Sequence, residues 1–152
     1  MIISSEKELI SFGRKVGRKL HQKLAQDAAP VVIELIGDVG AGKTTLTRGI
    51  ADGLGVKEPV TSPSFTISKR YAFSLDTPNS GELIHYDFYR LEDPGLMVED
   101  FAESIASPNT VVVIEWGESV KNLLPAEHLS FQIFLNDDGT RTIKELSRWN
   151  FI

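Results

Sequence analysis

A glycine-rich stretch followed by a lysine and a threonine offers the clearest chemistry in this sequence. Residues 37–44 read Gly-Asp-Val-Gly-Ala-Gly-Lys-Thr and match the phosphate-binding pattern G-x-x-x-x-G-K-[ST]. Glycines allow a tight turn that directs backbone N–H groups at an anion, and the start of a following helix adds a positive field. Lys43 can reach the β- and γ-phosphates, and the Thr44 hydroxyl can ligate Mg²⁺. The stretch therefore predicts a site for a nucleoside triphosphate with Mg²⁺. The expected cofactor-binding residues are Asp38, Val39, Gly40, Ala41, Gly42, Lys43, Thr44 and Thr45.

Two carboxylates stand at the ends of strand-like segments. Glu115 closes an apolar run, as the acid of a Walker B element does, and Asp87 lies near the end of the segment 82–89. Such an acid holds Mg²⁺ directly or through water, or orients the attacking water. The sequence does not divide these roles between the two acids, and a solvated cap or an ion pair with a neighbouring arginine is the alternative for each. The candidate catalytic residues are Lys43, Asp87 and Glu115, and the candidate metal ligands are Thr44, Asp87 and Glu115.

Other residues near these acids have weaker functional interpretations. His85 is far in sequence from the other two histidines, which is more typical of a structural residue than of a metal ligand. Trp116 and Tyr89 are expected to be half-buried aromatics under the nucleotide-facing loops. Arg90 could reach a phosphate or a partner, although surface arginines are mostly solvated.

These residues need a framework to position them. The apolar residues 31–36 predict a buried strand before the loop, and residues 44–54 predict a helix after it. A capping box predicts an earlier helix over residues 5–26, with its apolar stripe on the sheet. Gly13 and Gly17 would destabilise that helix unless they permit a close approach.

The rest of the chain alternates strand and helix patterns. Strands are expected at 66–73, 82–89, 110–114, 129–135 and 140–146, with a turn at 76–81. A short helix should start at 92–94 and carry Leu96, Met97, Phe101 and Ile105 on one face, and another should end at Leu124. The pattern predicts an α/β, three-layer P-loop NTPase fold. Its central mixed, largely parallel sheet should carry helices on both faces.

Length and composition narrow the class of protein. The 152 residues are expected to form a single domain over 1–152, with 41% apolar residues and no cysteine. The net charge is −5 and there is no long basic run, which argues against a direct electrostatic grip on nucleic acid. The first residues lack a signal-peptide layout and no stretch of 18 residues is apolar, so we expect a cytoplasmic location and no membrane association.

Four motifs, in this order, resemble the TsaE (YjeE) family. They are Gly37–Thr45, Thr61–Phe65, His85–Leu91 and Ile114–Trp116. Each motif after the first is weak alone, but the ordered set is specific, and the resemblance covers nearly the whole chain. The family is the small bacterial ATPase of the tRNA threonylcarbamoyladenosine machinery.

The resemblance implies an accessory subunit that binds and hydrolyses ATP with Mg²⁺, slowly when alone. The expected partner is a heterocomplex of two sugar-kinase-like proteins, one of which transfers the threonylcarbamoyl group to tRNA. ATP turnover would reset that complex, and tRNA would be met only indirectly. Asp87 and Glu115 match the family's two essential acids. A switch-like loop is implied at Thr61, Ser62, Pro63 and Ser64, with supporting roles for Tyr89, Arg90 and Trp116.

Three other functions fit a phosphate-binding loop. A small-molecule or nucleoside kinase needs an acceptor pocket and a lid, for which little chain is left. A GTP switch is disfavoured because the guanine-reading motif Asn-Lys-x-Asp is absent. The third alternative function is a scaffold protein that depends on ATP binding but does not hydrolyse ATP. For the adenine ring, the candidates are the N-terminal segment near Ser4 and Ser5 or the last hairpin near Arg141.

Overall fold

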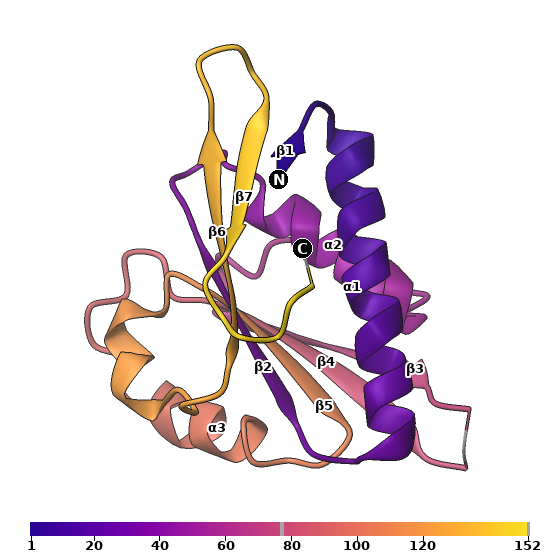
Figure 1. Cartoon of the computed structure of the whole chain (residues 1–152). Helices are drawn as coiled ribbons and strands as arrows, with labels where there is room; N and C mark the ends of the chain where they lie inside the picture. The colour runs from indigo at the N-terminus through magenta and orange to yellow at the C-terminus, as the bar shows by residue number, and fades with distance from the viewer. Residues whose placement is uncertain (77, 152) are drawn as a thin grey trace.

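A seven-stranded sheet forms the centre of the computed structural model, which describes residues 1–76 and 78–151 (Figure 1). The strands are β1 (Ile2–Ile3), β2 (Val31–Ile36), β3 (Ser68–Ser74), β4 (Ser80–Asp87), β5 (Thr110–Glu115), β6 (Leu129–Leu135) and β7 (Arg141–Glu145). Their spatial order is β1-β7-β6-β2-β5-β4-β3. The central strands β6, β2, β5 and β4 are parallel, whereas β3, β7 and β1 pair antiparallel to their neighbours. The predicted mixed, largely parallel sheet is confirmed.

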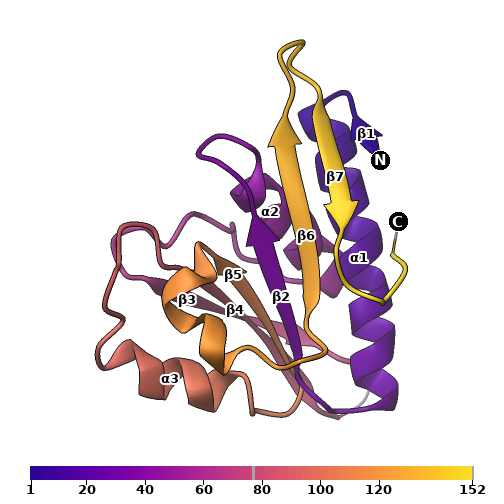
Figure 2. The ribbon, with the colours of Figure 1, turned by 60° about the vertical axis from the view of Figure 1, so that its left-hand side comes forward.

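Helices cover both faces of this sheet. They are α1 (Glu6–Gln26), α2 (Lys43–Leu54), α3 (Met97–Ser104) and the 3₁₀-helix η1 (Gly117–Leu123). Helices α1 and α2 lie on one face, and α3 and η1 lie on the other, as a comparison of Figures 1 and 2 makes clear. The predicted α/β architecture with three layers is therefore confirmed. No helix among residues 1–76 and 78–151 is both long and apolar enough to cross a membrane.

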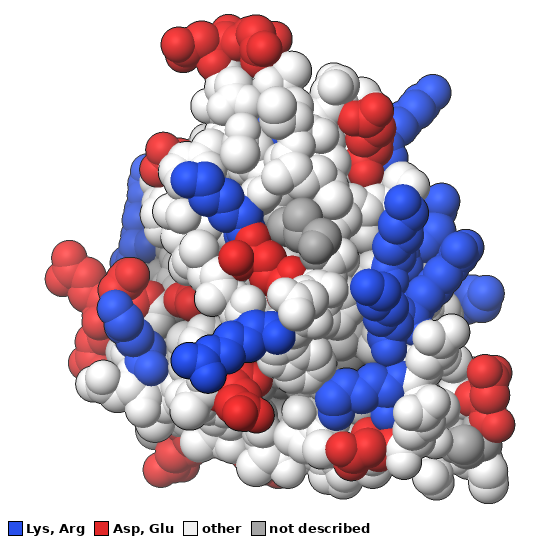
Figure 3. Space-filling view, in the orientation of Figure 1, with Lys and Arg blue, Asp and Glu red and all other residues white. Residues whose placement is uncertain are grey.

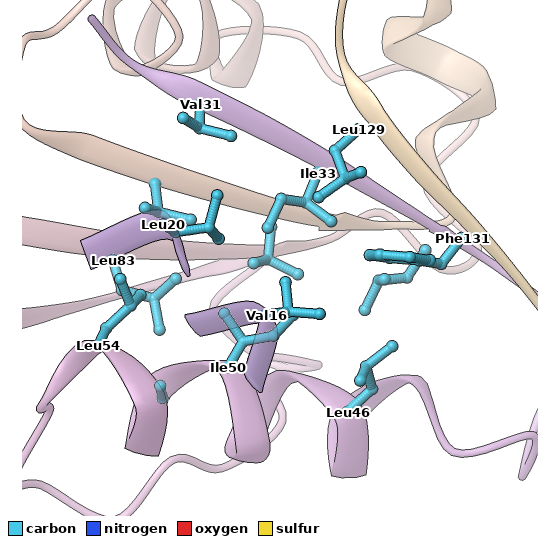
Figure 4. Close-up of a cluster of buried hydrophobic side chains, with 14 of the residues drawn as sticks. Val16, Leu20, Val31, Ile33, Leu46, Ile50, Leu54, Leu83, Leu129 and Phe131 are labelled. Atoms are coloured by element: carbon cyan, nitrogen blue, oxygen red, sulfur yellow. The ribbon is translucent and has the colours of Figure 1, made fainter. Parts of the chain in front are cut away.

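The larger hydrophobic core lies between the sheet and the pair α1 and α2 (Figure 4). It includes Val16 and Leu20 of α1, Leu46, Ile50 and Leu54 of α2, and Ile33, Leu83, Leu129 and Phe131 of the sheet. The expected contact of the first helix with the sheet is present, since the rings of Phe12 and Phe131 meet edge to face at 5.5 Å. Burial of this apolar surface holds α2, and with it the preceding loop, against the sheet.

Glycines let α1 and α2 approach each other closely. Two come from each helix, namely Gly13, Gly17, Gly49 and Gly53. A Cβ atom on Gly13 would lie 2.7 Å from the carbonyl oxygen of Leu46, and one on Gly49 would lie 2.5 Å from that of Ile10. Both distances are too short for carbon and oxygen, and the neighbouring atoms belong to rigid helical backbone. Gly13 and Gly17 therefore do permit a close approach, here to helix α2.

Cationic side chains are concentrated on α1, although the chain carries a net charge of −5. Between positions 14 and 23 they are Arg14, Lys15, Arg18, Lys19 and Lys23, with no acidic residue among them. Figure 3 shows Lys and Arg gathered over the region where α1 lies in Figure 1. Arg14 pairs with Asp52 and Lys23 with Asp27. Lys15, Arg18 and Lys19 are exposed and form no ion pair within the described part of the chain.

Several element boundaries differ from the sequence-based prediction. The strand expected from 66 starts at Ser68, because Ile67 has a φ of 66° and leaves the extended conformation. The strand expected over 82–89 covers 80–87. The placement of Leu96 was wrong: it precedes α3 and its side chain is 87% exposed, while Phe101 is buried as expected.

The two ends of the chain contain features that the sequence did not specify. Strand β1 was not predicted, because two residues carry no periodic signal, and it forms by pairing with β7. In the C-terminal tail, Trp149 and Phe151 pack against the larger core. Of the turn expected at 76–81, Thr77 lies outside the described residues.

The glycine contact yields a stability prediction. Replacing Gly13 with alanine should lower the free energy of unfolding by about 1–2 kcal/mol, because overpacking outweighs alanine's better helix propensity. Chemical denaturation measures this change. Ser11→Ala is the matched control: Ser11 is exposed on the same helix, so its change should stay within about 0.5 kcal/mol. An unchanged stability of the Gly13 variant would show that the two helices need not be so close.

Candidate functional site

The glycine-rich loop links the end of β2 to the start of α2. Gly40 and Gly42 have φ values of 80° and 110°, which residues with a Cβ atom rarely adopt. Gly37 is needed for space instead, since a Cβ there would lie 2.5 Å from the carbonyl oxygen of Ile133. Helix α2 has no acidic residue in its first turn, so the positive end of the helix is not neutralised. The loop has the geometry of an anion-binding cradle.

Lys43 folds back over this cradle. Its Nζ atom donates hydrogen bonds to the carbonyl oxygens of Gly37, at 2.7 Å, and Asp38, at 2.9 Å. The same atom lies 4.4 Å from the centroid of the Trp116 ring. Burial lowers the pKa of the Lys43 ammonium from its ordinary value, and the negative charges of Glu115 and Asp87 oppose that shift. The ammonium is thus held between two carbonyl oxygens of the glycine-rich loop and the Trp116 ring.

The two candidate acids lie side by side at the ends of β4 and β5. Asp87 and Glu115 are directly paired in the parallel register of these strands, and their exposed fractions are only 7% and 4%. The Thr44 hydroxyl donates to Glu115 Oε1 at 3.0 Å. Asp87 Oδ1 accepts a hydrogen bond from the backbone N–H of Tyr89. The structure therefore brings Lys43, Thr44 and both acids to one edge of the sheet.

The oxygen atoms at this edge suit Mg²⁺. The Thr44 hydroxyl and the Glu115 carboxylate are hard oxygen ligands, already within 3.0 Å of each other. Among the described residues no group of three or more His, Cys, Asp or Glu side chains could hold a metal ion by itself. Mg²⁺ usually binds through one or two carboxylates and completes its shell with phosphates and water.

The predicted supporting residues form one cluster, which contacts Lys43 through the Trp116 ring. The Tyr89 and Trp116 rings lie 4.9 Å apart, and the Arg90 guanidinium lies 4.9 Å from the centre of the Tyr89 ring. Arg90 and Trp116 have φ values of 59° and 58°, which are unusual for residues other than glycine. Such backbone strain costs on the order of 1–3 kcal/mol and is concentrated at functional sites.

The switch-like loop is not joined to the phosphate-binding loop by side-chain hydrogen bonds within the described residues. Ser62 and Ser64 bond to each other at 2.6 Å, and Thr61 bonds to Lys69. Three residues past Ser64, the carbonyl oxygen of Ile67 accepts a hydrogen bond from the Asp87 N–H at 2.8 Å.

His85 has a contact that the sequence interpretation missed. Its Nε2 atom lies 2.9 Å from Glu115 Oε1, and the residue is fully buried. The signal was present in the sequence, because residues two apart on a strand share a face, which puts His85 on the same side of β4 as Asp87.

Arg141 of β7 also contacts the site. Its Nε atom donates to the carbonyl oxygen of Ala41 at 2.8 Å, inside the phosphate-binding loop. The two residues are 100 positions apart, so no local pattern could reveal this bond. The earlier prediction that Arg141 contacts adenine stays a prediction.

A cleft of about 240 Å³ opens beside the loop, between β6 and η1. Its walls include Gly37, Asp38, Trp116, Gly117, Glu118 and Phe134. The cleft leaves one side of the phosphate-binding loop accessible from solvent.

Comparisons with known proteins identify the family. The family model described as threonylcarbamoyl adenosine biosynthesis protein TsaE matches residues 3–143. The tRNA threonylcarbamoyladenosine biosynthesis protein TsaE of Streptomyces coelicolor is 39% identical over 120 residues, which cover 79% of this chain and 77% of that protein. The protein of the same name from Haemophilus influenzae is 33% identical over 152 residues, covering 97% of this chain and 89% of the relative.

A solved structure agrees with the sequence comparisons. The crystal structure of YdiB from Bacillus subtilis superposes with a TM-score of 0.71 at 29% identity, covering 99% of this chain and 85% of that one. The similarity supports a P-loop NTPase-type architecture for this chain. Because the family model matches nearly the whole sequence, the chain belongs to the TsaE family of tRNA threonylcarbamoyladenosine biosynthesis proteins.

Proposed function

We propose that this protein binds ATP with Mg²⁺ in the loop 37–44 and hydrolyses it as an accessory subunit of tRNA threonylcarbamoyladenosine biosynthesis. ATP turnover would reset the complex that transfers the threonylcarbamoyl group. The observation that carries the proposal is the convergence of Lys43, Thr44, Asp87 and Glu115 at the mouth of the loop.

Phosphate binding follows from the loop's donors. The polyphosphate would accept hydrogen bonds from the backbone N–H groups of the loop and the start of α2. Lys43 would exchange the carbonyl oxygens of Gly37 and Asp38 for phosphate oxygens, which are stronger acceptors because they are charged. The ammonium is already desolvated, so this exchange gives up little hydration.

The acids would then divide the chemistry of hydrolysis. Mg²⁺, when bound, neutralises negative charge on the phosphates. The Thr44 hydroxyl and the carboxylate of Glu115 or Asp87 would hold it, and the remaining carboxylate would orient the attacking water. Both carboxylates are almost fully buried, so their orientation is fixed before the substrate binds.

Two surface features support a protein partner. Phe65 follows the switch-like loop directly, and its side chain is fully exposed to solvent. A large apolar side chain in such a position is typical of an interface residue. The cationic surface of α1 offers a second contact, through Lys15, Arg18 and Lys19. We propose that the partner is the heterocomplex of two sugar-kinase-like proteins, and that its docking orders the switch-like loop. ATP turnover without it should be slow.

Amide variants of the two acids test the chemistry. Glu115→Gln and Asp87→Asn keep the shape of each side chain but remove its charge. Each should lower kcat for ATP hydrolysis by about 100-fold or more, because the charge holds the metal or orients the water. A phosphate-release assay measures kcat, and thermal unfolding confirms that the variants fold.

Exposed acids provide matched controls for these two variants. Glu103→Gln on α3 and Asp137→Asn in the last hairpin make the same chemical changes on the surface, and both should keep the wild-type rate. An unaffected rate for Glu115→Gln or Asp87→Asn would remove that residue from the catalytic group.

The partner proposal predicts stimulation of hydrolysis. Adding the two purified sugar-kinase-like proteins should raise the ATPase rate by at least about tenfold, through a transition-state group or an ordered loop. Phe65→Ser should lose this increase and keep the basal rate, whereas Leu135→Ser, an exposed apolar residue on β6, should respond like wild type. Equal rates with and without the partner proteins would contradict the proposal.

A further inference from the structure

The carboxylate of Glu115 receives two hydrogen bonds on a single oxygen atom. Oε1 accepts from the Thr44 hydroxyl at 3.0 Å and faces Nε2 of His85 at 2.9 Å. The two groups come from different elements, the first turn of α2 and the middle of β4. Glu115 is thus held from two sides, and the two bonds need not persist together.

The surroundings of His85 fix which nitrogen carries its proton. Nδ1 is buried and has no hydrogen-bond partner among the described residues, while Nε2 faces a carboxylate oxygen. A proton on Nδ1 alone would bury a donor without an acceptor and turn the Nε2 lone pair toward Glu115. The arrangement therefore requires an Nε2–H that donates to Glu115.

Packing alone does not account for a histidine at this position. The residue lies on β4 in the interior of the sheet, between the parallel strand β5 and the antiparallel strand β3. An aliphatic side chain would fill such a place without leaving an unpaired ring nitrogen, which is unfavourable in a protein interior. The bond to Glu115 is the one hydrogen bond of this imidazole within the described residues.

The geometry of the two strands makes this bond rigid. In the register of β4 and β5, His85 is level with Val113 and Asp87 is level with Glu115. Side chains two residues apart on a strand share a face of the sheet. The His85 imidazole therefore reaches the Glu115 carboxylate diagonally, from β4 across to β5. Both residues lie on regular, hydrogen-bonded strands, which hold side chains more precisely than loops do.

We propose that His85 is a positioning residue for Glu115. If the Thr44 hydroxyl served as a ligand of Mg²⁺ instead of donating to Glu115, the Nε2–H of His85 would still hold Oε1, so the carboxylate would retain its orientation. His85 acts through Glu115 and does not touch the nucleotide. This role rests on the proposed ATP hydrolysis and adds a residue to it.

Two amide variants separate positioning from packing. The side-chain nitrogen of glutamine matches the position of Nε2, whereas that of asparagine matches Nδ1 and falls short of Glu115. His85→Gln should keep kcat for ATP hydrolysis within a few-fold of wild type. His85→Asn and His85→Leu should lower kcat by about 10- to 100-fold, the usual effect of losing a residue that orients a metal-site ligand. The Kd for ADP should be unchanged in all three, because the phosphate cradle is intact.

The controls distinguish failure of this inference from failure of the proposed function. His128→Leu removes a partly exposed histidine that pairs with Glu34, and it should leave kcat unchanged. Thermal unfolding checks each variant, and if His85→Leu does not fold, the comparison of Gln with Asn decides. Equal kcat values for His85→Gln and His85→Asn would overturn only the positioning role. So would a His85→Leu variant that hydrolyses ATP as fast as the wild-type protein. A wild-type protein that binds ATP without hydrolysing it would overturn both.

Discussion

The parallel register of β2, β5 and β4 is the constraint on which the site depends. It places the phosphate-binding loop, Glu115 and Asp87 at the same edge of the sheet. The hydrogen bond from Thr44 to Glu115 then joins the first turn of α2 to the end of β5. A shift of one residue between β4 and β5 would turn Asp87 and His85 to the opposite face of the sheet. The hydrophobic core that determines the register therefore also determines which side chains meet at the site.

The contact between α1 and α2 helps to hold the loop at the edge of the sheet where Asp87 and Glu115 lie. Because α1 and α2 meet through glycines, their backbones are in direct contact, and α2 cannot move without disturbing α1. Arg141 of β7 also donates a hydrogen bond to the carbonyl oxygen of Ala41 in the loop. The phosphate-binding loop is thus restrained by β2, α1 and β7, which suits a cradle whose donors must be aligned before an anion arrives.

Local pattern was enough to predict most of this fold and to indicate residues that the structure brings together, namely Lys43, Thr44, Asp87 and Glu115. The phosphate-binding loop, the first helix and the central strands have strong periodic or motif signals, and they appear where they were expected. The contacts of His85 with Glu115 and of Arg141 with Ala41 were not predicted, because they join residues distant in sequence and depend on strand pairing. Strand β1 and the exposure of Leu96 were missed for a related reason: short segments take their conformation from tertiary neighbours.

The central claim is that a polyphosphate binds in the cradle and takes the place of the carbonyl oxygens now bound by Lys43. Titration calorimetry of the wild-type protein and Lys43→Ala with ATP and Mg²⁺ tests it most directly, with Lys57→Ala as an exposed-lysine control. The account predicts saturable binding of one nucleotide by wild type and by the Lys57 variant, and a large loss of affinity for the Lys43 variant. No uptake of ATP by the folded wild-type protein, or equal affinity in all three, would contradict it.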